Sequence, residues 1–143
     1  MNLGTETEKG EPETATVLVI ADARSGACCS TMVPAKGLDA FGVRVGCRFL
    51  DELGYQNVLM QSDGEPAITA WAKKVRQDWF RVTDTAGQIE AEKQMPLRHS
   101  PKDDHASNGV IESVVHSVEG VVRTLRFSSE HNLRLKIGPT SPL

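Results

Sequence analysis

The most regular hydrophobic pattern in the chain lies in its last third. Apolar residues follow one another there at steps of three or four positions: Ile111, Val114, Val118, Val122 and Leu125. This spacing is that of one face of an α-helix. A second row at the same spacing is polar and consists of Glu112, His116, Glu119 and Arg123. The pattern predicts a long amphipathic helix over about residues 107–128, whose polar row is either a solvated face or part of a site.

The first part of the chain combines two short apolar runs with one helical stripe. Residues 16–21 (TVLVIA) and 27–33 (ACCSTMV) predict two strands, which a short turn joins into an antiparallel hairpin. Apolar residues at helical spacing predict a helix over residues 38–53. Gly42 and Gly46 inside it each cost about 1 kcal/mol relative to Ala. We therefore hypothesise that another element approaches this helix closely at the two glycines.

The middle of the chain predicts a strand, a helix and a long connection. Residues 57–61 (NVLMQ) predict a strand that is parallel to a neighbour, because a helix precedes it. Pro66 suits the first turn of another helix, and Trp71 and Trp79 lie on its apolar stripe, so we expect both in the core. Residues 81–98 show no strong period and predict a loop with a short strand near its end. The elements together predict an α/β domain with a mixed sheet flanked by helices.

Composition and charge are those of an ordinary globular domain of 143 residues. The net charge of −3 comes from residues 1–15, so the remainder is neutral and its charge neither indicates nor excludes a nucleic-acid partner. We predict a disordered acidic segment over residues 1–15, a folded core over 16–131 and a flexible tail over 132–143. No apolar run has the length of a membrane span, and the 3 cysteines form no C-x-x-C pair. We therefore expect an intracellular protein, nuclear or cytoplasmic, without a membrane partner.

Two acidic residues lie in segments that are typical of sites. Asp63 directly follows the predicted strand 57–61, and ligands of open α/β sheets bind in the loops at the carboxyl ends of parallel strands. Glu112 lies on the polar side of the first turn of the long helix. Carboxylates brought together hold Mg²⁺ or Mn²⁺, and two such ions catalyse phosphodiester chemistry. The residues alone do not single out this pair, because the chain contains 19 acids.

A resemblance to a known family connects the two segments. Asp63-Gly64-Glu65-Pro66 resembles the second-acid segment of retroviral-type integrases. The segment from Ser100-Pro101 to Asn108-Gly109-Val110-Ile111-Glu112 resembles their S-P…N-G-x-V/I-E segment, which ends in the third acid. The resemblance covers about residues 16–127 and is strongest to integrase catalytic cores of retrotransposon Pol polyproteins.

The resemblance implies a ribonuclease H-like fold, Mg²⁺ or Mn²⁺ as cofactor, and DNA strand transfer during the integration of a transposable element. By the same resemblance Asp63 and Glu112 are catalytic metal ligands. The residues implied to contact DNA are Asn108, Gly109, His116 and Arg123.

Three features depart from the family pattern. Asp63 and Glu112 are 49 positions apart, more than is usual, and we assign the difference to an insertion within residues 81–98. The row after Glu112 is less basic than in the family, which weakens contact with phosphates. The hairpin 16–33 resembles the family's second and third strands, so that the first strand and its catalytic Asp are expected upstream of Met1. Asp22 is the alternative first ligand.

The sequence leaves three hypotheses open. The chain is an integrase-like polynucleotidyl transferase core, active or inactive through lack of the first Asp. Alternatively, it is a non-catalytic ribonuclease H-like remnant that binds nucleic acid or forms a homodimer. In the third hypothesis it is an unrelated α/β domain in which Asp63 and Glu112 are solvated surface acids, and a wide separation of these carboxylates would favour it.

Overall fold

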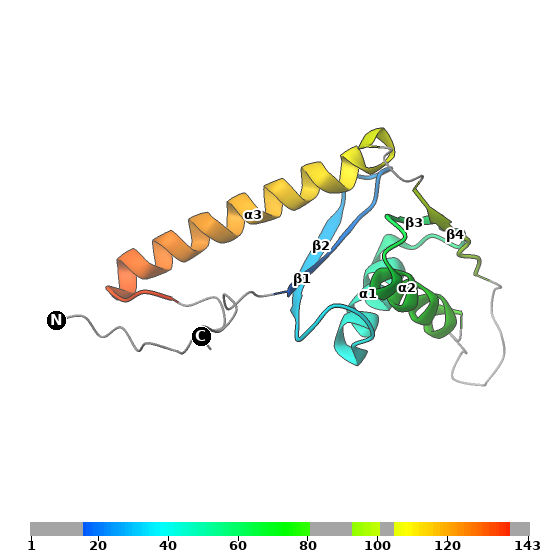
Figure 1. Cartoon of the computed structure of the whole chain (residues 1–143), viewed down its shortest axis with the longest axis horizontal. Helices are drawn as coiled ribbons and strands as arrows, with labels where there is room; N and C mark the ends of the chain where they lie inside the picture. The colour runs from blue at the N-terminus through cyan, green and yellow to red at the C-terminus, as the bar shows by residue number, and fades with distance from the viewer. Residues whose placement is uncertain (1–15, 81–92, 101–104, 138–143) are drawn as a thin grey trace.

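The structure, a computed structural model, describes residues 16–80, 93–100 and 105–137 and contains helices and strands in alternation (Figure 1). Its elements in chain order are β1 (Thr16–Ala21), β2 (Cys28–Val33), α1 (Ala40–Leu53), β3 (Met60–Ser62), α2 (Pro66–Trp79), β4 (Leu97–His99) and α3 (His105–Leu133). The α/β class predicted from the sequence is confirmed. Residues 1–15 and 81–92, with the predicted acidic segment and most of the predicted loop, lie outside the described residues.

Strands β1 and β2 form the predicted antiparallel hairpin. Their register runs from Thr16 opposite Val33 to Ala21 opposite Cys28. One residue further, the Asp22 N–H donates to the Ala27 carbonyl at 2.8 Å. Because hydrogen-bonded pairs alternate in an antiparallel ladder, Ile20 and Leu18 bond to β2 while the backbone groups of Val19 and Val17 point away from it. The N–H and C=O groups of Val17 and Val19 therefore form an edge of β1 that does not pair with β2.

Strands β3 and β4 form a parallel pair, as expected for a strand that follows a helical crossover. The Met60 N–H donates to the Pro96 carbonyl at 3.1 Å, and the Ser100 N–H donates to the Ser62 carbonyl at 2.8 Å. A residue in a parallel ladder bonds on one side only, and successive residues face opposite sides. The backbone of Leu59 is therefore turned away from β4.

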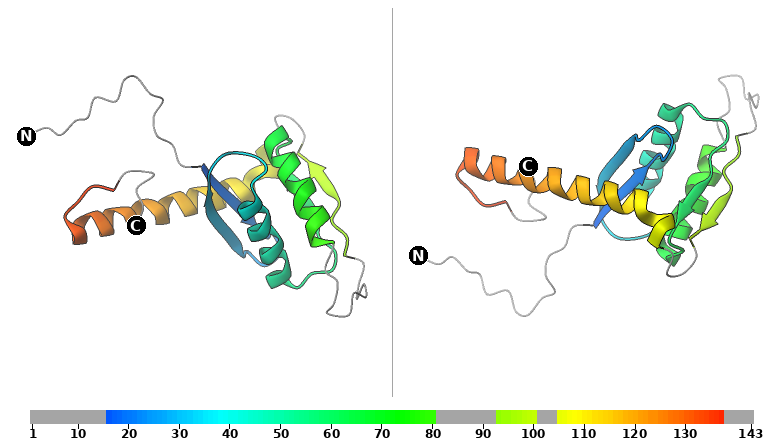
Figure 2. Two further views of the ribbon diagram at one scale, coloured as in Figure 1. Left: turned by 90° about the horizontal axis from the view of Figure 1, so that it is seen from below. Right: turned by 90° about the horizontal axis from the view of Figure 1, so that it is seen from above.

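The sheet differs from the single mixed sheet that the sequence predicts. Within the described residues the strands form two separate two-stranded sheets, β1–β2 and β3–β4. Figures 1 and 2 show β3 lying between β1 and β4, so the two sheets are neighbours. Leu18 and Ile20 of one sheet and Val58 and Met60 beside the other pack against the same core. The molecule thus has one layer of strands, divided into two halves, with α1 and α2 on one face and α3 on the other (Figure 2).

The core lies between the two strand pairs and the packed helices α1 and α2. Its buried members are Val43, Leu50, Trp71, Ala72, Val75, Trp79 and Met95. The prediction that both tryptophans lie in the core is confirmed, since Trp71 is 5% exposed and Trp79 is 1% exposed. The hypothesis of a close approach at a glycine is confirmed at Gly46, where a Cβ atom would lie 2.7 Å from Cζ2 of Trp71.

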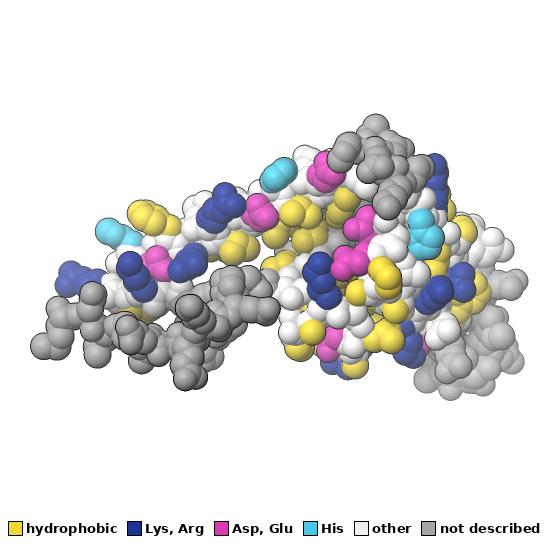
Figure 3. All heavy atoms as spheres, in the orientation of Figure 1, with side chains coloured by type: hydrophobic (Ala, Val, Ile, Leu, Met, Phe, Trp, Pro, Cys, Tyr) yellow, Lys and Arg dark blue, Asp and Glu magenta, His cyan; other side chains and the backbone are white. Residues whose placement is uncertain are grey.

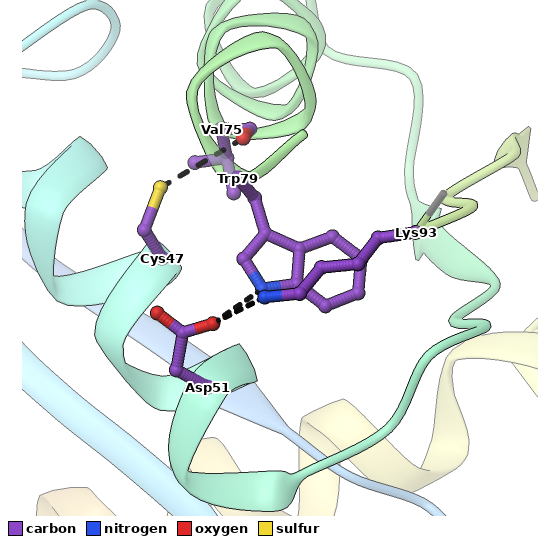
Figure 4. Close-up of polar contacts among 5 residues, drawn as sticks. All are labelled: Cys47, Asp51, Val75, Trp79 and Lys93. Atoms are coloured by element: carbon purple, nitrogen blue, oxygen red, sulfur yellow. Dashed lines mark hydrogen bonds and ion pairs between the residues drawn. The ribbon is translucent and has the colours of Figure 1, made fainter. Parts of the chain in front are cut away.

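A polar contact closes the end of this core (Figure 4). The Asp51 carboxylate of α1 accepts hydrogen bonds from Nε1 of Trp79 at 2.9 Å and from Nζ of Lys93 at 2.8 Å. The Lys93 ammonium also lies 4.7 Å from the centroid of the Trp79 ring, in cation–π geometry. Lys93 precedes β4, so one carboxylate joins α1, α2 and the chain that leads into the parallel pair.

Helix α3 contacts β1 and then continues beyond the rest of the molecule (Figure 1). It is longer than predicted, since it ends at Leu133, inside the segment from residue 132 that we expected to be a flexible tail. Several large apolar side chains on its second half are exposed: Val121, Val122, Leu125, Phe127 and Leu133. None of the described helices is both long and apolar enough to cross a membrane.

Replacing Gly46 by Ala tests the close packing of α1 on α2. We expect Gly46→Ala to lower the free energy of unfolding by about 1–3 kcal/mol, because the new methyl group overlaps the buried Trp71 ring. The control is Gly120→Ala in α3, where nothing lies within 4 Å and the helix gains about 1 kcal/mol of propensity. Urea denaturation measures both, and a Gly46→Ala protein as stable as the wild type would contradict the packing described.

Candidate functional site

The loop between β3 and α2 carries Asp63, the first of the predicted site acids. Its Oδ1 atom accepts a hydrogen bond from the Glu65 N–H at 3.0 Å, and Gly64 adopts the left-handed conformation with φ of 81°. The side chain of His99 lies against Gly64, where an added Cβ would be 3.7 Å from its ring. Pro66 follows as the first residue of α2, as predicted. Asp63 is thus an exposed carboxylate at the carboxyl end of a parallel strand.

A chain of side-chain hydrogen bonds joins β3 to the start of α3. Oγ of Ser100 accepts from Nε2 of Gln61 at 2.9 Å and donates to Oδ1 of Asn108 at 2.6 Å. Ser100 is only 7% exposed, so both bonds are partly shielded from water. Strand β3, two residues before Asp63, is therefore in direct contact with the Ser100–Glu112 segment, whose two parts are themselves joined by the bond from Ser100 to Asn108.

This contact sets where Asp63 and Glu112 lie. Gln61 and Asp63 are two residues apart in extended chain, on one face and about 7 Å from each other along it. Asn108 and Glu112 are four residues apart in α3, on one face and about 6 Å from each other along the axis. Asp63 and Glu112 therefore each lie within about 7 Å, measured along the chain or the helix axis, of one member of the Gln61–Ser100–Asn108 contact.

A groove of about 570 Å³ lies beside Asp63, between β1, the β3–α2 loop and α3. We call it the central groove. Apolar side chains dominate its walls, among them Leu18, Val33, Ile68, Trp71, Val115 and Val118. Figure 3 shows apolar side chains gathered beneath α3 beside a hollow that acidic side chains border. Val33 at the end of β2, Thr16 at the start of β1 and Asp63 after β3 all line it, so β2 and β3 run in the same direction and β1 runs opposite to them.

The charged groups of the central groove are mostly carboxylates. Asp39, Asp63, Glu65 and Glu119 line it together with one ammonium group, that of Lys36. Lys36 pairs with Glu65 at 3.3 Å. Glu119 rather than Glu112 is the α3 acid that lines the groove, although Ile111 beside Glu112 also does so.

Asp22 lies away from this end of the molecule. It follows the last residue of β1, and six residues of strand, about 20 Å, separate it from Thr16 at the groove. Its carboxylate accepts hydrogen bonds from the Ser25 hydroxyl, from the N–H groups of Arg24 and Ser25, and from the Tyr55 hydroxyl. The bond from the Ser25 hydroxyl, followed by those from the two N–H groups and Tyr55, holds the pKa of Asp22 below its ordinary value. Asp22 closes the hairpin turn and is not brought to Asp63.

Of the four residues that the resemblance places on DNA, Gly109, His116 and Arg123 are exposed on α3, whereas Asn108 is half-buried at its bond to Ser100. Gly109 has no atom within 4 Å of where a Cβ would stand, so another molecule could approach its backbone closely. Further along, Glu119 pairs with Arg123 at 3.3 Å and lies 3.9 Å from Nδ1 of His116. Both pairs are exposed and contribute little to stability. Their carboxylate nevertheless neutralises part of the positive charge that a phosphate would meet.

The predicted metal site is incomplete in the part of the chain that the structure describes. No group of three or more His, Cys, Asp or Glu side chains is placed there to hold a metal ion. Asp63 and Glu112 both lie near the Gln61–Ser100–Asn108 contact, but Asp63 lines the central groove and Glu112 does not. The chain matches no known protein-family model, and no curated protein or solved structure is significantly similar to it.

Three residues near the site were not singled out as functional from the sequence. His99 reaches the Asp63 loop because β4 pairs in parallel with β3, and its Nδ1 lies 3.4 Å from Oγ of Ser62. Gln61 and Ser100 carry the contact with α3. The register of two distant strands determines these positions, and no local pattern in the sequence reports that register.

Substituting Ser100 tests the link between β3 and α3. We expect Ser100→Ala to lower the free energy of unfolding by about 1–3 kcal/mol, because it leaves the amides of Gln61 and Asn108 without this shared partner. The control is Ser117→Ala, which removes only an exposed bond to the Ser113 carbonyl one turn back. Amide chemical shifts around Asn108 and Glu112 should move in the first variant alone. Unchanged shifts and stability in Ser100→Ala would show that the link does not hold α3.

Substituting Ser25 tests the environment of Asp22. We expect Ser25→Ala to raise the pKa of Asp22 towards its ordinary value, measured by NMR titration of the carboxyl carbon. A lowered pKa stabilises the folded chain above the unfolded carboxyl pKa, and this stability is lost as pH falls through the folded pKa. The stability difference between wild type and Ser25→Ala should therefore shrink in acid. Ser30→Ala is the control, and an unchanged Asp22 pKa in Ser25→Ala would contradict this assignment.

Proposed function

We propose that the chain is an integrase-like polynucleotidyl transferase core that acts on DNA through carboxylate-bound metal. The observation that carries the proposal is the Gln61–Ser100–Asn108 contact, because it joins β3, the strand directly before Asp63, to the segment that ends in Glu112. The order of a hairpin, a crossover helix, a parallel strand pair and a long helix supports a ribonuclease H-like arrangement. The strands form two sheets rather than one, so this fold assignment is part of the proposal.

The proposal assigns Asp63 and Glu112 as the ligands of one weakly held Mg²⁺ or Mn²⁺ ion. Mg²⁺ is commonly bound by one or two carboxylates and keeps several waters, so two acids are enough to hold it. A bound ion supplies Lewis-acid activation of a phosphodiester and of its attacking oxygen. Among the described residues no third carboxylate completes a two-metal set. The proposal is therefore a transferase core whose activity is low or absent, because the first catalytic Asp of the family has no counterpart beside Asp63.

The DNA contacts in this proposal come from the start and the exposed row of α3. Asn108 and Gly109 stand at the helix start beside the Ser100 contact, and His116 and Arg123 follow at steps of about two turns. The Glu119 carboxylate, which pairs with Arg123 and lies 3.9 Å from His116, competes with a phosphate for these side chains. We therefore expect weak, strongly salt-dependent DNA binding.

A second function is favoured by the missing third carboxylate together with the exposed apolar side chains of α3. In this alternative the chain is a non-catalytic ribonuclease H-like remnant that binds nucleic acid or forms a homodimer. Val121, Leu125 and Phe127 are 58%, 61% and 74% exposed, and such a surface is typical of an interaction face. The two functions differ in one property, the cleavage of DNA.

Paramagnetic Mn²⁺ locates the proposed metal site without requiring activity. We expect Mn²⁺ to broaden the amide signals around Asp63 and Glu112, and Asp63→Asn or Glu112→Gln to weaken its binding by about tenfold or more. Asp22→Asn is the matched control, and it should leave the affinity unchanged because Asp22 lies at the other end of β1. Broadening centred on Asp22, or none at Asp63 and Glu112, would contradict the proposed ligands.

Nicking of supercoiled DNA by the purified chain separates the two functions. The transferase proposal predicts Mn²⁺-dependent nicking that Asp63→Asn abolishes and Asp22→Asn does not. Because one carboxylate is missing, we expect a rate far below that of a complete metal site. Saturating Mn²⁺ binding at Asp63 and Glu112 without any nicking would favour the non-catalytic remnant.

A further inference from the structure

The central groove lies between two strand edges that belong to the same layer. Leu18 and Ile20 of β1 and Met60 of β3 pack against the same core, yet β1 pairs only with β2 and β3 only with β4 in the described residues. By the alternation of the two ladders, the backbone of Val17 and Val19 points away from β2 and that of Leu59 points away from β4. β3 lies between β1 and β4, so these edges face each other (Figure 2).

Apolar walls stand on both faces of this opening. Ile68 and Trp71 of α2 line the central groove on one side, and Ile111, Val115 and Val118 of α3 line it on the other. A strand that occupies it would be covered on both faces, and such strands are rich in Val and Ile without polar alternation. Trp71, which lines the groove, also has a buried donor, since its Nε1 has no hydrogen-bond partner in the described part of the chain.

Charge at the mouth of the groove restricts the occupant further. Four carboxylates and a single ammonium group line it; Glu65 pairs with that ammonium and Glu119 pairs with Arg123 of α3. Asp63 has no cationic partner in the described residues, where its carboxylate accepts a hydrogen bond from the Glu65 N–H. An occupant that carries Lys or Arg at this end therefore complements the groove, whereas an acidic one is repelled.

We infer that the central groove binds an extended peptide segment as an added β-strand, apolar along its length and basic at its carboxyl end. The longer free edge is that of β1, with six residues against three in β3, and antiparallel pairing is slightly the more stable kind. The segment therefore runs antiparallel to β1 and parallel to β3. Its carboxyl end then lies beside Asp63 and Thr16, where the carboxylates are. This mode of recognition uses backbone hydrogen bonds for affinity and the two apolar walls for specificity.

The inference is independent of the proposed transferase function. It uses the strand edges, the apolar walls and the charge of the groove, and it requires neither metal nor DNA. The experiment is carried out without divalent ions, so its failure would leave the Mn²⁺ experiment on Asp63 and Glu112 unaffected.

The probe is a synthetic acetylated peptide, Thr-Val-Ile-Val-Ile-Lys-Lys, titrated into the isotope-labelled full chain. We expect saturable shifts of the amide signals of Val17, Val19 and Leu59, and intermolecular contacts between the peptide backbone and Val19. The first control peptide, Thr-Val-Pro-Val-Pro-Lys-Lys, keeps the charge but lacks two N–H donors, and it should bind at least about tenfold more weakly. The second, ending in Glu-Glu, should be weakened by charge repulsion.

Two variants of α3 localise the binding. Val118→Glu places a carboxylate in the apolar wall and should weaken peptide binding by about tenfold or more. Val121→Glu is its matched control, because Val121 is exposed and does not line the groove, and it should bind the peptide like the wild type. Circular dichroism of both variants establishes that they fold.

Several results would overturn the inference. The absence of saturable shifts at 1 mM peptide (about the weakest affinity that such pairing should give) is one. Equal binding of the proline peptide is another, because it would show adsorption without strand pairing. A chain that is already dimeric through β1 and excludes the peptide would show that a second copy occupies the groove instead.

Discussion

The contact of Gly46 with the Trp71 ring is the interaction on which the rest of the structure depends. The two small sheets share no ladder in the described residues, so they are held together by the core on α1 and α2 and by α3, which contacts β1 and is bonded to Ser100. A residue larger than glycine at position 46 would push α2 away, because its Cβ would lie 2.7 Å from the ring. The Asp51 carboxylate adds a polar tie between α1, α2 and the chain before β4.

The divided sheet decides what the candidate site can contain. Asp63 is set at the carboxyl end of β3 by the parallel pair, and Glu112 is set by the bonds that fix the start of α3 to Ser100. The central groove lies between the two strand pairs, and Asp63 lines it whereas Glu112 does not. Among the described residues, no group of three or more acidic, His or Cys side chains is placed to hold a metal ion.

The sequence predicts the elements well and their assembly less well. Apolar residues at helical spacing predict α1 and α3, and Pro66 predicts the start of α2. These predictions succeed because each depends only on residues that are near one another in the sequence. The single mixed sheet was predicted from the crossover rule, which gives strand direction but not whether two strands become neighbours. The sequence does not decide whether Asp22 is a metal ligand or a residue that stabilises the hairpin turn, because an Asp after a strand is compatible with both roles. Its bonds to Ser25 and Tyr55 could be seen only in the folded chain.

The Ser100 contact and the place of His99 show the same limit for the site. Both follow from the register of β3 on β4, which pairs residues nearly 40 positions apart, Ser62 with His99. Local patterns carry no information about that register. The motif around Asn108 and Glu112 indicated an active-site segment, but it did not indicate that Glu119, two turns later, would be the α3 acid that lines the groove.

Amide hydrogen exchange followed by NMR tests most directly the claim that the strand layer is divided. The amides of Ile20 and Met60 bond within their own pairs, and those of Val19 and Leu59 point into the opening between the pairs. We expect Ile20 and Met60 to be strongly protected and Val19 and Leu59 to exchange at rates close to those of exposed chain. Protection of Val19 and Leu59 equal to that of their neighbours would show that the two sheets are joined, and would contradict the account.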